Sequence, residues 1–124
     1  DIHYIKIGSF CNLQDGCVLH VDIGTAPTEV GDYVTVGHRA VLHGCIVESN
    51  CLIGMGAIIL DNAVVGNGSI VAAGAVVKVG MKIPDHSMVA GNPAVIKRRV
   101  SDDEVEILVG HAKKYREWAR SYKF

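Results

Sequence analysis

The feature of this sequence that most constrains its fold is a six-residue repeat that runs through most of the chain. Aliphatic residues recur at this spacing, with a longer step after Leu19 and a step of five before Val47. The repeating aliphatic positions are Ile7, Leu13, Leu19, Val30, Val36, Leu42, Val47, Ile53, Ile59, Val65, Val71, Val77, Ile83, Val89 and Val95. Neither an amphipathic helix nor a hairpin sandwich sustains a period of six, so the pattern predicts a solenoid of short coils.

Two further positions of the hexapeptide repeat as well. Glycine follows the aliphatic residue directly at Gly8, Gly31, Gly37, Gly54 and Gly66. Small residues come four positions after it, at Cys11, Cys17, Val34, Ala40, Cys51, Ala57, Ala63, Ser69 and Ala75. This arrangement is typical of flat faces joined by tight corners. Three hexapeptides complete one triangular coil, so residues 1–97 are predicted to form about five stacked coils of parallel strands.

The repeat is expected to end near Val95, and a helix follows. Ser101 and Glu104 form a capping box, which predicts the start of a helix. Its apolar stripe comprises Val105, Leu108, Ala112, Tyr115, Trp118, Ala119 and Tyr122, and its charged face comprises Lys113, Arg116, Arg120 and Lys123. We expect residues 98–124 to form an amphipathic helix packed along the coils of a single domain. A peptide-binding or membrane-surface helix is the alternative.

The composition excludes several classes of protein. Hydrophobic residues make up 49% and charged residues 20% of the 124 residues, which indicates a soluble globular chain. The net charge of −1 gives no reason to expect nucleic acid as a partner. The apolar runs are shorter than the roughly 20 residues that span a bilayer, so membrane insertion is not expected.

The cysteines and the first residue bear on localisation. Cys11, Cys17, Cys45 and Cys51 form no C-x-x-C pair and are interpreted as small core residues in a reducing compartment, the cytoplasm being the first expectation. The chain begins at Asp1 rather than at Met, so we expect it to be trimmed, and an upstream targeting segment stays open.

Three histidines form the candidate site. His20 and His43 each directly follow an inward aliphatic residue of the same face in adjacent coils, so they should stack and point outward together. Two imidazoles in that arrangement can share a metal ion at about 2.0–2.1 Å. His38 falls on the preceding face near another corner, and should reach such a pair only from a neighbouring subunit. Ordinary surface histidines are the alternative, and we interpret His3, His86 and His111 in that way.

Two motifs carry a family resemblance. The stretch Asn12–His20, NLQDGCVLH, resembles the N-x-Q-D-G-x-x-x-H signature of γ-class carbonic anhydrases, and the stretch Val36–Cys45 resembles the G-H-x-x-x-x-H-G segment that follows it. The resemblance covers nearly the whole chain. It implies a left-handed β-helix and a homotrimer. It also implies metal sites shared between subunits, with His20 and His43 from one subunit and His38 from the next.

The resemblance also implies a reaction. A metal-bound hydroxide at the subunit interface would add to carbon dioxide and give bicarbonate, with Zn²⁺ as the expected metal and Co²⁺, Ni²⁺ or Fe²⁺ as other options. Gln14 would hold the hydroxide and Asn12 would position the substrate, both near the face edge that carries His20. The simpler interpretation is that Gln14 is a polar position of the repeat and Asn12 a corner residue.

Accessory roles follow from the same resemblance. The resemblance implies an arginine two residues before the aspartate that matches Asp1, which would pair with an aspartate across the interface and help bind bicarbonate. This sequence starts after that point. Asp22 and Glu29 lie in the segment where the family places its proton-transfer acid, although solvated loop charges are the simpler interpretation. Tyr115 resembles a tyrosine near the site in some relatives, and core packing is its alternative role.

Two other functions compete with this prediction. The trimer could hold a structural metal or act as an assembly subunit with little turnover. Acyl transfer is the less favoured alternative: Gly91-Asn92-Pro93-Ala94, after Ile83-Pro84, resembles the closing segment of hexapeptide acetyltransferases. That segment is shared across the superfamily, and acetyltransferases need one catalytic histidine rather than three in metal-ligand register.

Overall fold

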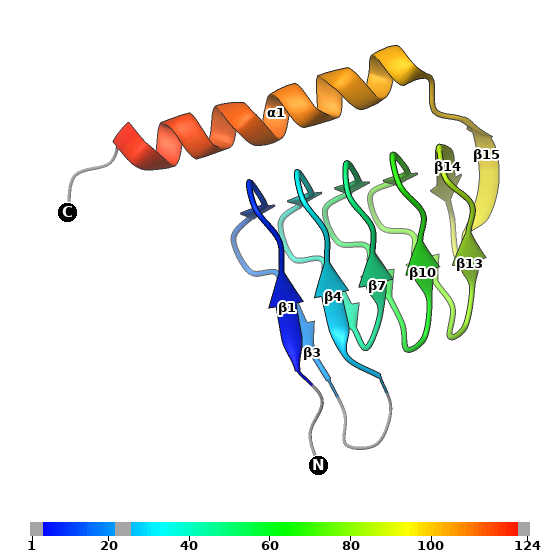
Figure 1. The fold of residues 1–124 in the computed structure, drawn as a ribbon. Helices are drawn as coiled ribbons and strands as arrows, with labels where there is room; N and C mark the ends of the chain where they lie inside the picture. The colour runs from blue at the N-terminus through cyan, green and yellow to red at the C-terminus, as the bar shows by residue number, and fades with distance from the viewer. Residues whose placement is uncertain (1–3, 22–25, 122–124) are drawn as a thin grey trace.

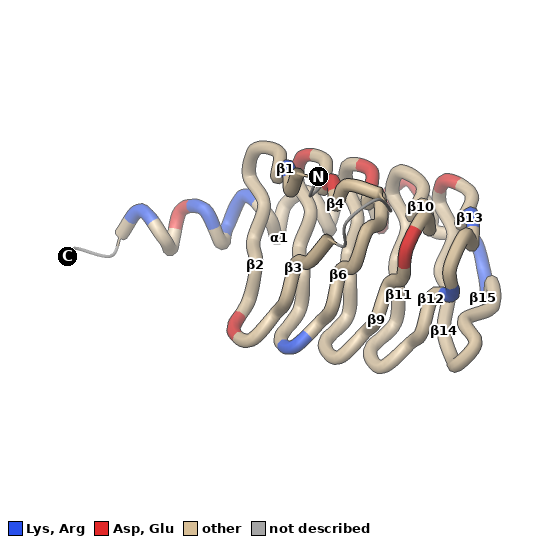
Figure 2. The backbone as a smooth tube through the Cα atoms, turned by 90° about the horizontal axis from the view of Figure 1, so that it is seen from below, with Lys and Arg blue, Asp and Glu red and all other residues tan. Residues whose placement is uncertain are grey.

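Three sheets of short parallel strands form the faces of a triangular prism, and one long helix lies along it (Figure 1). The structure is a computed structural model that describes residues 4–21 and 26–121. The expected left-handed β-helix with a C-terminal helix is confirmed. Seen from below, successive coils lie side by side along the stack (Figure 2).

Each face contains one strand from each successive coil. The first face comprises β1 (Ile5–Ile7), β4 (Thr28–Val30), β7 (Ile46–Val47), β10 (Val64–Val65) and β13 (Lys82–Ile83). The second comprises β2 (Asn12–Leu13), β5 (Thr35–Val36), β8 (Leu52–Ile53), β11 (Ile70–Val71), β14 (Ser87–Ala90) and β15 (Val95–Arg99). The third comprises β3 (Val18–His20), β6 (Val41–His43), β9 (Ile58–Ile59) and β12 (Val76–Val77). The pairing is parallel except between β14 and β15, which is antiparallel.

The core fills the centre of the prism with the predicted aliphatic and small residues. From Val30 to Val89 the repeating aliphatic positions are at most 3% exposed. Ile7 and Leu13 are 43% and 37% exposed, because the first coil has a described neighbour on one side only. Val95 is 47% exposed, so its assignment to the repeat was wrong. It begins β15, which reverses direction, and Ala94 is buried instead.

The corners between the first and second faces explain how the chain turns so tightly. One residue at each of these corners has a left-handed backbone conformation: Phe10, Tyr33, Asn50, Gly68 and His86, with φ between 55° and 68°. Most residues adopt this conformation at a cost, so stacking must compensate for it. The rings of Phe10 and Tyr33 are stacked, with centroids 4.9 Å apart and planes 10° apart.

The helix α1 (Asp102–Ser121) begins where the sequence predicts it. The Ser101 hydroxyl accepts a hydrogen bond from the Glu104 backbone N–H, and the Glu104 carboxylate accepts one from the Ser101 backbone N–H, each at 3.1 Å. Arg98 adds two hydrogen bonds to the same carboxylate at 2.8 Å. The capping box is therefore confirmed, and it joins the helix to the end of β15.

The packing of α1 differs from a simple two-sided pattern. Leu108 and Ala112 are its buried residues, and the helix runs past the first coil (Figure 1). Lys113 and Arg116, predicted on the solvent face, instead lie over the rings of Tyr33 and Phe10, at 5.7 and 4.3 Å from the centroids. Long cationic side chains can cover aromatic faces, so the charged stripe also contributes to docking. Tyr122 and Lys123 lie outside the described residues.

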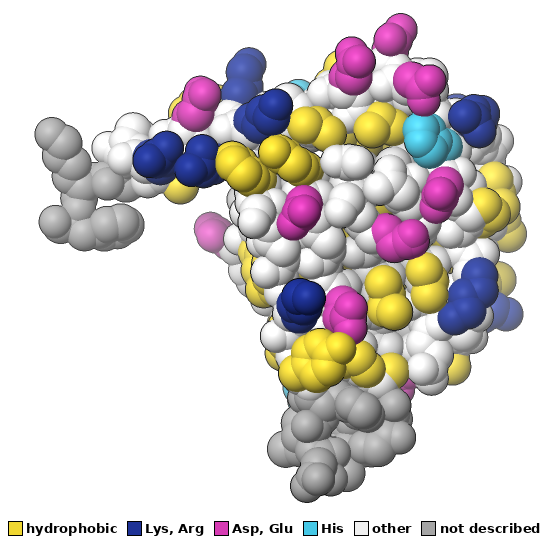
Figure 3. Space-filling view, viewed as in Figure 1, with side chains coloured by type: hydrophobic (Ala, Val, Ile, Leu, Met, Phe, Trp, Pro, Cys, Tyr) yellow, Lys and Arg dark blue, Asp and Glu magenta, His cyan; other side chains and the backbone are white. Residues whose placement is uncertain are grey.

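Apolar, acidic and basic side chains are interspersed over the first face (Figure 3). Among the described helices, none combines the length and apolar character that crossing a membrane requires.

Candidate metal centre

The two stacked histidines lie where the hexapeptide register predicts them. His20 ends β3 and His43 ends β6, and the two are direct partners in the parallel pairing of these strands. Their ring centroids are 4.9 Å apart, and Nδ1 of His20 lies 3.0 Å from Nε2 of His43. The predicted stacking of one imidazole over the other is therefore confirmed.

This geometry fits two ligands of one small ion. Two imidazole nitrogens bound tetrahedrally at about 2.0–2.1 Å lie roughly 3.3 Å apart. The 3.0 Å between the nearest ring nitrogens is close to that value. Within residues 4–21 and 26–121, however, no group of three His, Cys, Asp or Glu side chains could hold a metal. The described part of one chain thus supplies two suitable nitrogens.

Two residues that sequence reasoning missed hold the ends of these strands. The Thr28 hydroxyl donates to the His20 carbonyl and accepts from the Gly44 backbone N–H, both at 2.8 Å. Asp61 Oδ1 lies 2.5 Å from Nδ1 of His43. Asp61 follows His43 by 18 residues, which is one coil. That spacing was the available signal, because it places Asp61 beside His43 on the next coil.

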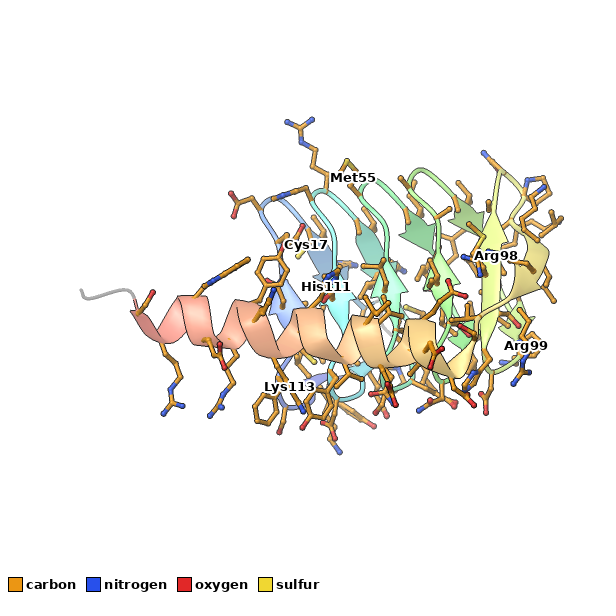
Figure 4. All side chains as sticks on the ribbon, turned by 90° about the horizontal axis from the view of Figure 1, so that it is seen from above. Cys17, Met55, Arg98, Arg99, His111 and Lys113 are labelled. Carbon is orange, nitrogen blue, oxygen red and sulfur yellow. The ribbon has the colours of Figure 1, made fainter. Side chains whose placement is uncertain are left out.

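His38 lies at the opposite edge of the third face, at the corner that precedes β6. Asp15, Arg39, Met55 and Gly56 line a pocket with it. Met55 projects at this corner, across α1 from Lys113 (Figure 4). Two pockets that His38 lines include neither His20 nor His43. The predicted separation of His38 from the pair is thus present in the single chain.

Asn12 and Gln14 belong to the His38 side of the molecule. They line a second pocket with His38, Asp15, Leu13, Tyr115, Trp118 and Ala119. Their expected position near the edge that carries His20 was wrong, because β2 and β3 are separated by a full corner of the coil. The Asn12 side-chain nitrogen is buried and has no hydrogen-bond partner among the described residues.

Tyr115 and Trp118 of α1 cover this second pocket without entering the core. Tyr115 is 36% and Trp118 55% exposed, and their rings meet edge to face with centroids 5.1 Å apart. Core packing of Tyr115, the alternative favoured by the helical stripe, is therefore wrong. The helix instead places its phenol beside Asn12, Gln14 and His38.

Of the accessory acids, Glu29 is the one within the described residues, and its contacts lie on the first face. Glu29 lies on β4 rather than in a loop, and its carboxylate accepts a hydrogen bond of 2.6 Å from the Tyr4 hydroxyl. It lines a pocket of the first face with residues such as Asp32 and Glu48. The hydrogen bond from Tyr4 to the Glu29 carboxylate raises the pKa of the Tyr4 phenol. Asp1 and Asp22 lie outside the described residues.

The cysteines serve packing rather than ligation. Cys45 and Cys51 are buried, and burial raises the pKa of each thiol to about 12. Cys11 and Cys17 are partly buried and pack against the core, and burial raises their pKa values as well. Burial thus favours the neutral thiol over the thiolate that reacts or binds a metal.

Comparison with known proteins places this geometry in a family. The family model described as bacterial transferase hexapeptide (six repeats) matches residues 44–78. A probable carbonic anhydrase of Methanocaldococcus jannaschii is 49% identical over 99% of this chain and 79% of its own length. The mitochondrial gamma carbonic anhydrase 2 of Arabidopsis thaliana is 43% identical over 93% of this chain, which spans only 43% of that relative.

Solved structures show the same fold under other names. A hexapeptide transferase family protein from Anaplasma phagocytophilum has a TM-score of 0.86 at 34% identity, over 96% of this chain and 69% of the other. A protein of Bacillus cereus described as a putative acetyltransferase has a TM-score of 0.83 at 38% identity, over 87% of this chain and 62% of the other. The likeness to the archaeal relative covers both histidine motifs and nearly the whole sequence, and the chain therefore belongs to the γ-carbonic anhydrase-like family of hexapeptide-repeat proteins.

Proposed function

We propose that this chain forms a homotrimer that binds a divalent metal between subunits and catalyses the reversible hydration of carbon dioxide to bicarbonate. The observation that carries the proposal is the His20–His43 pair, with ring nitrogens 3.0 Å apart on adjacent coils. The names of the archaeal and plant relatives support the choice of reaction. Zn²⁺ is the proposed metal, and Co²⁺, Ni²⁺ or Fe²⁺ would suit the same imidazole donors.

The division of the histidines between two edges supports a site between subunits. His20 and His43 end strands of the third face, whereas His38 lies at the corner before it, in another pocket. In a ring of three identical subunits, each interface brings two different surface patches together. His38 of one subunit would then complete the ligand set begun by the pair of its neighbour.

The residues around His38 have the chemistry that the reaction needs. When bound, the metal would act as a Lewis acid that lowers the pKa of a coordinated water. Gln14 offers an amide that can orient a polar oxygen. Asn12, whose buried amide nitrogen has no hydrogen-bond partner among the described residues, is the proposed substrate-positioning residue. The Tyr115 phenol is a further donor on the same pocket. Asp22 and Glu29 remain proposed proton-transfer residues, and Asp1 remains a proposed accessory residue at the subunit interface.

Acyl transfer and a purely structural trimer are the competing functions. The Bacillus cereus and Anaplasma phagocytophilum structures have transferase names, so acyl transfer needs its own assay. A stacked histidine pair supported by a carboxylate is a feature that metal binding explains and that acyl transfer does not require. A metal-loaded trimer without turnover would support the structural role instead.

The first test measures metal content and carbon dioxide hydration on the same preparation. We expect about one zinc per subunit, and hydration that a chelator removes and added zinc restores. Acetyl transfer from acetyl coenzyme A to amine acceptors is measured in parallel and is expected to be absent. Metal without hydration would contradict the enzyme proposal, and chelator-insensitive hydration would contradict the metal site.

Subunit complementation tests the sharing of the site. His38→Ala and His43→Ala chains are each expected to be inactive as homotrimers. When the two variants are mixed at equal amounts and reassembled, one interface in four combines the intact His20–His43 pair of one chain with the intact His38 of its neighbour. Hydration should therefore return to about a quarter of the wild-type rate. A site contained in one subunit would give no recovery, and that result would overturn the shared model.

A further inference from the structure

Among the described residues, Asp61 is an acidic side chain in direct contact with the histidine pair. It lies in the corner after β9, one coil beyond His43, and its Oδ1 is 2.5 Å from Nδ1 of His43. The side chains of His43 and Asp61 are 24% and 22% exposed, so water screens the contact only in part. The opposite nitrogen of the ring, Nε2, faces His20.

Other aspartates at corners of this prism do different work. Oδ1 of Asp32 accepts the Ser9 backbone N–H at 2.8 Å, and Oδ1 of Asp85 accepts the Asn67 backbone N–H at 2.9 Å. Each therefore satisfies a main-chain donor of the preceding coil. Asp61 reaches a histidine ring instead, although it also stands one coil beyond its partner. Satisfying a backbone donor at a corner explains the positions of Asp32 and Asp85. It does not explain why Asp61 contacts a histidine ring.

The chain also leaves room for this contact. A Cβ atom added to Gly44 would lie 2.5 Å from Oδ1 of Asp61. Gly44 has a φ of 62°, which glycine tolerates best, so it serves both the turn and the carboxylate. The residue after His43 thus permits the carboxylate of the next coil to approach the imidazole.

We propose that Asp61 is a positioning residue that fixes the ring orientation and tautomer of His43 for metal binding. The inference rests on the metal site proposed above. A proton on Nδ1, shared with the carboxylate, leaves the lone pair on Nε2 directed toward the side where His20 lies. Ligating histidines are commonly oriented in this way by a carboxylate, which also makes the imidazole a stronger donor. The ligand would then be preorganised before the metal arrives.

The first experiment needs no metal. Nitrogen NMR of ring-labelled histidine in the metal-free wild-type trimer, at mildly alkaline pH, reports which ring nitrogen of His43 is protonated; a His43→Gln sample assigns the signal. A proton on Nδ1 is the expected result. A proton mainly on Nε2 would overturn the proposal, because Asp61 would then have no ring N–H to accept.

The second experiment compares metal affinities by competition with a chelator. Asp61→Asn should weaken zinc binding by about ten- to a hundredfold, and Asp61→Glu should restore part of that loss. Asp85→Asn is the matched control: it also removes a corner carboxylate, and it should leave the affinity unchanged. Equal affinity of the Asp61→Asn and wild-type trimers would overturn the proposal, as would an equal loss in Asp85→Asn.

The two experiments separate this inference from the proposed function. If the wild-type trimer bound no metal, the proposed function would fail. The tautomer of His43 would still test whether Asp61 orients the ring. If the wild type bound zinc and Asp61→Asn bound it equally well, the metal site would stand and the positioning role would fall. Folded content, measured by circular dichroism for each variant, confirms that affinities are compared between folded chains.

Discussion

The surface around His20 and His43 and the surface around His38 differ in how completely one chain organises them. In the first, each histidine has a neighbour fixed by strand register, and Asp61 and Thr28 hold the strand ends with short hydrogen bonds. In the second, Asn12 has an unpartnered buried nitrogen among the described residues, and Tyr115 and Trp118 remain partly exposed. The pair is preorganised within one chain, whereas the surface around His38 has polar and aromatic groups still available for contact.

This difference shows how a repeat protein can distribute the residues of one site over two separate surfaces. Stacked coils fix residues of one face against each other, because each strand pairs with the next at a constant register. Residues on different faces are kept apart by the core that fills the prism. A site that needs both surfaces is then assembled by symmetry rather than by folding, which is the arrangement proposed here.

The largest expected effect comes from removing the pair itself. His43→Ala should abolish stoichiometric zinc binding, because it removes the ligand that register and Asp61 both position. His38→Ala should weaken binding but leave the two-nitrogen site. Metal analysis after gel filtration measures both, with His111→Ala on exposed α1 as the control. Greater metal loss in His38→Ala than in His43→Ala would show that His38 contributes more to metal binding than the pair does.

A smaller effect is expected on the His38 surface. Gln14→Leu should lower kcat/KM for carbon dioxide hydration by about a hundredfold, the usual cost of losing one polar group that acts on the reacting atoms. Metal content should stay unchanged, because Gln14 lies in the pocket with His38 rather than beside the pair. Stopped-flow hydration and metal analysis on the same sample check this. A loss of metal in Gln14→Leu would show that Gln14 supports metal binding, which contradicts its placement away from the pair.

Gly44→Ala tests how closely the pair surface is fitted. The new methyl group would displace the Asp61 carboxylate, so we expect zinc affinity to fall by about tenfold. The left-handed backbone adds a cost of about 1 kcal/mol. Gly74→Ala is the matched control, because Gly74 has a φ of 70° and nothing within 4 Å of its added Cβ. Similar affinities for the two variants would show that Asp61 can move without consequence.

The docking of α1 over the His38 surface should be held partly by its cations. Arg116→Ala removes a guanidinium 4.3 Å from the Phe10 centroid, and should cost about 0.5–1 kcal/mol of unfolding free energy. Arg120→Ala removes an exposed charge from the last turn of the same helix, and serves as control. Urea unfolding compares the two. Equal losses would show that the ring contact contributes nothing.

The weakest expected effect is on the acid stability of the helix start. The hydrogen bonds from Arg98 hold the pKa of Glu104 down, to about 2 from 4.5. A lowered folded-state pKa gives stability that is present above about 4.5 and is lost as the pH falls toward about 2. Helical circular dichroism should decline across that window, and less steeply in Glu104→Gln. Identical acid profiles would exclude the contribution.

Much of the fold could be predicted because the period of the sequence sets the geometry directly. A six-residue spacing assigned core positions from Val30 to Val89, and it stacked His20 on His43 despite the longer step between them. The capping box located the start of α1. Each of these depends on neighbours along the chain or on a constant strand register, which the sequence displays.

The tertiary structure alone decided where faces, corners and helix meet. It moved Asn12 and Gln14 to the His38 pocket, turned Lys113 and Arg116 onto aromatic rings, and brought Asp61 to His43. Side-chain direction at a corner and the path of α1 depend on packing between distant segments. The repeat period therefore determined which residues share a face, and three-dimensional packing decided which of them touch.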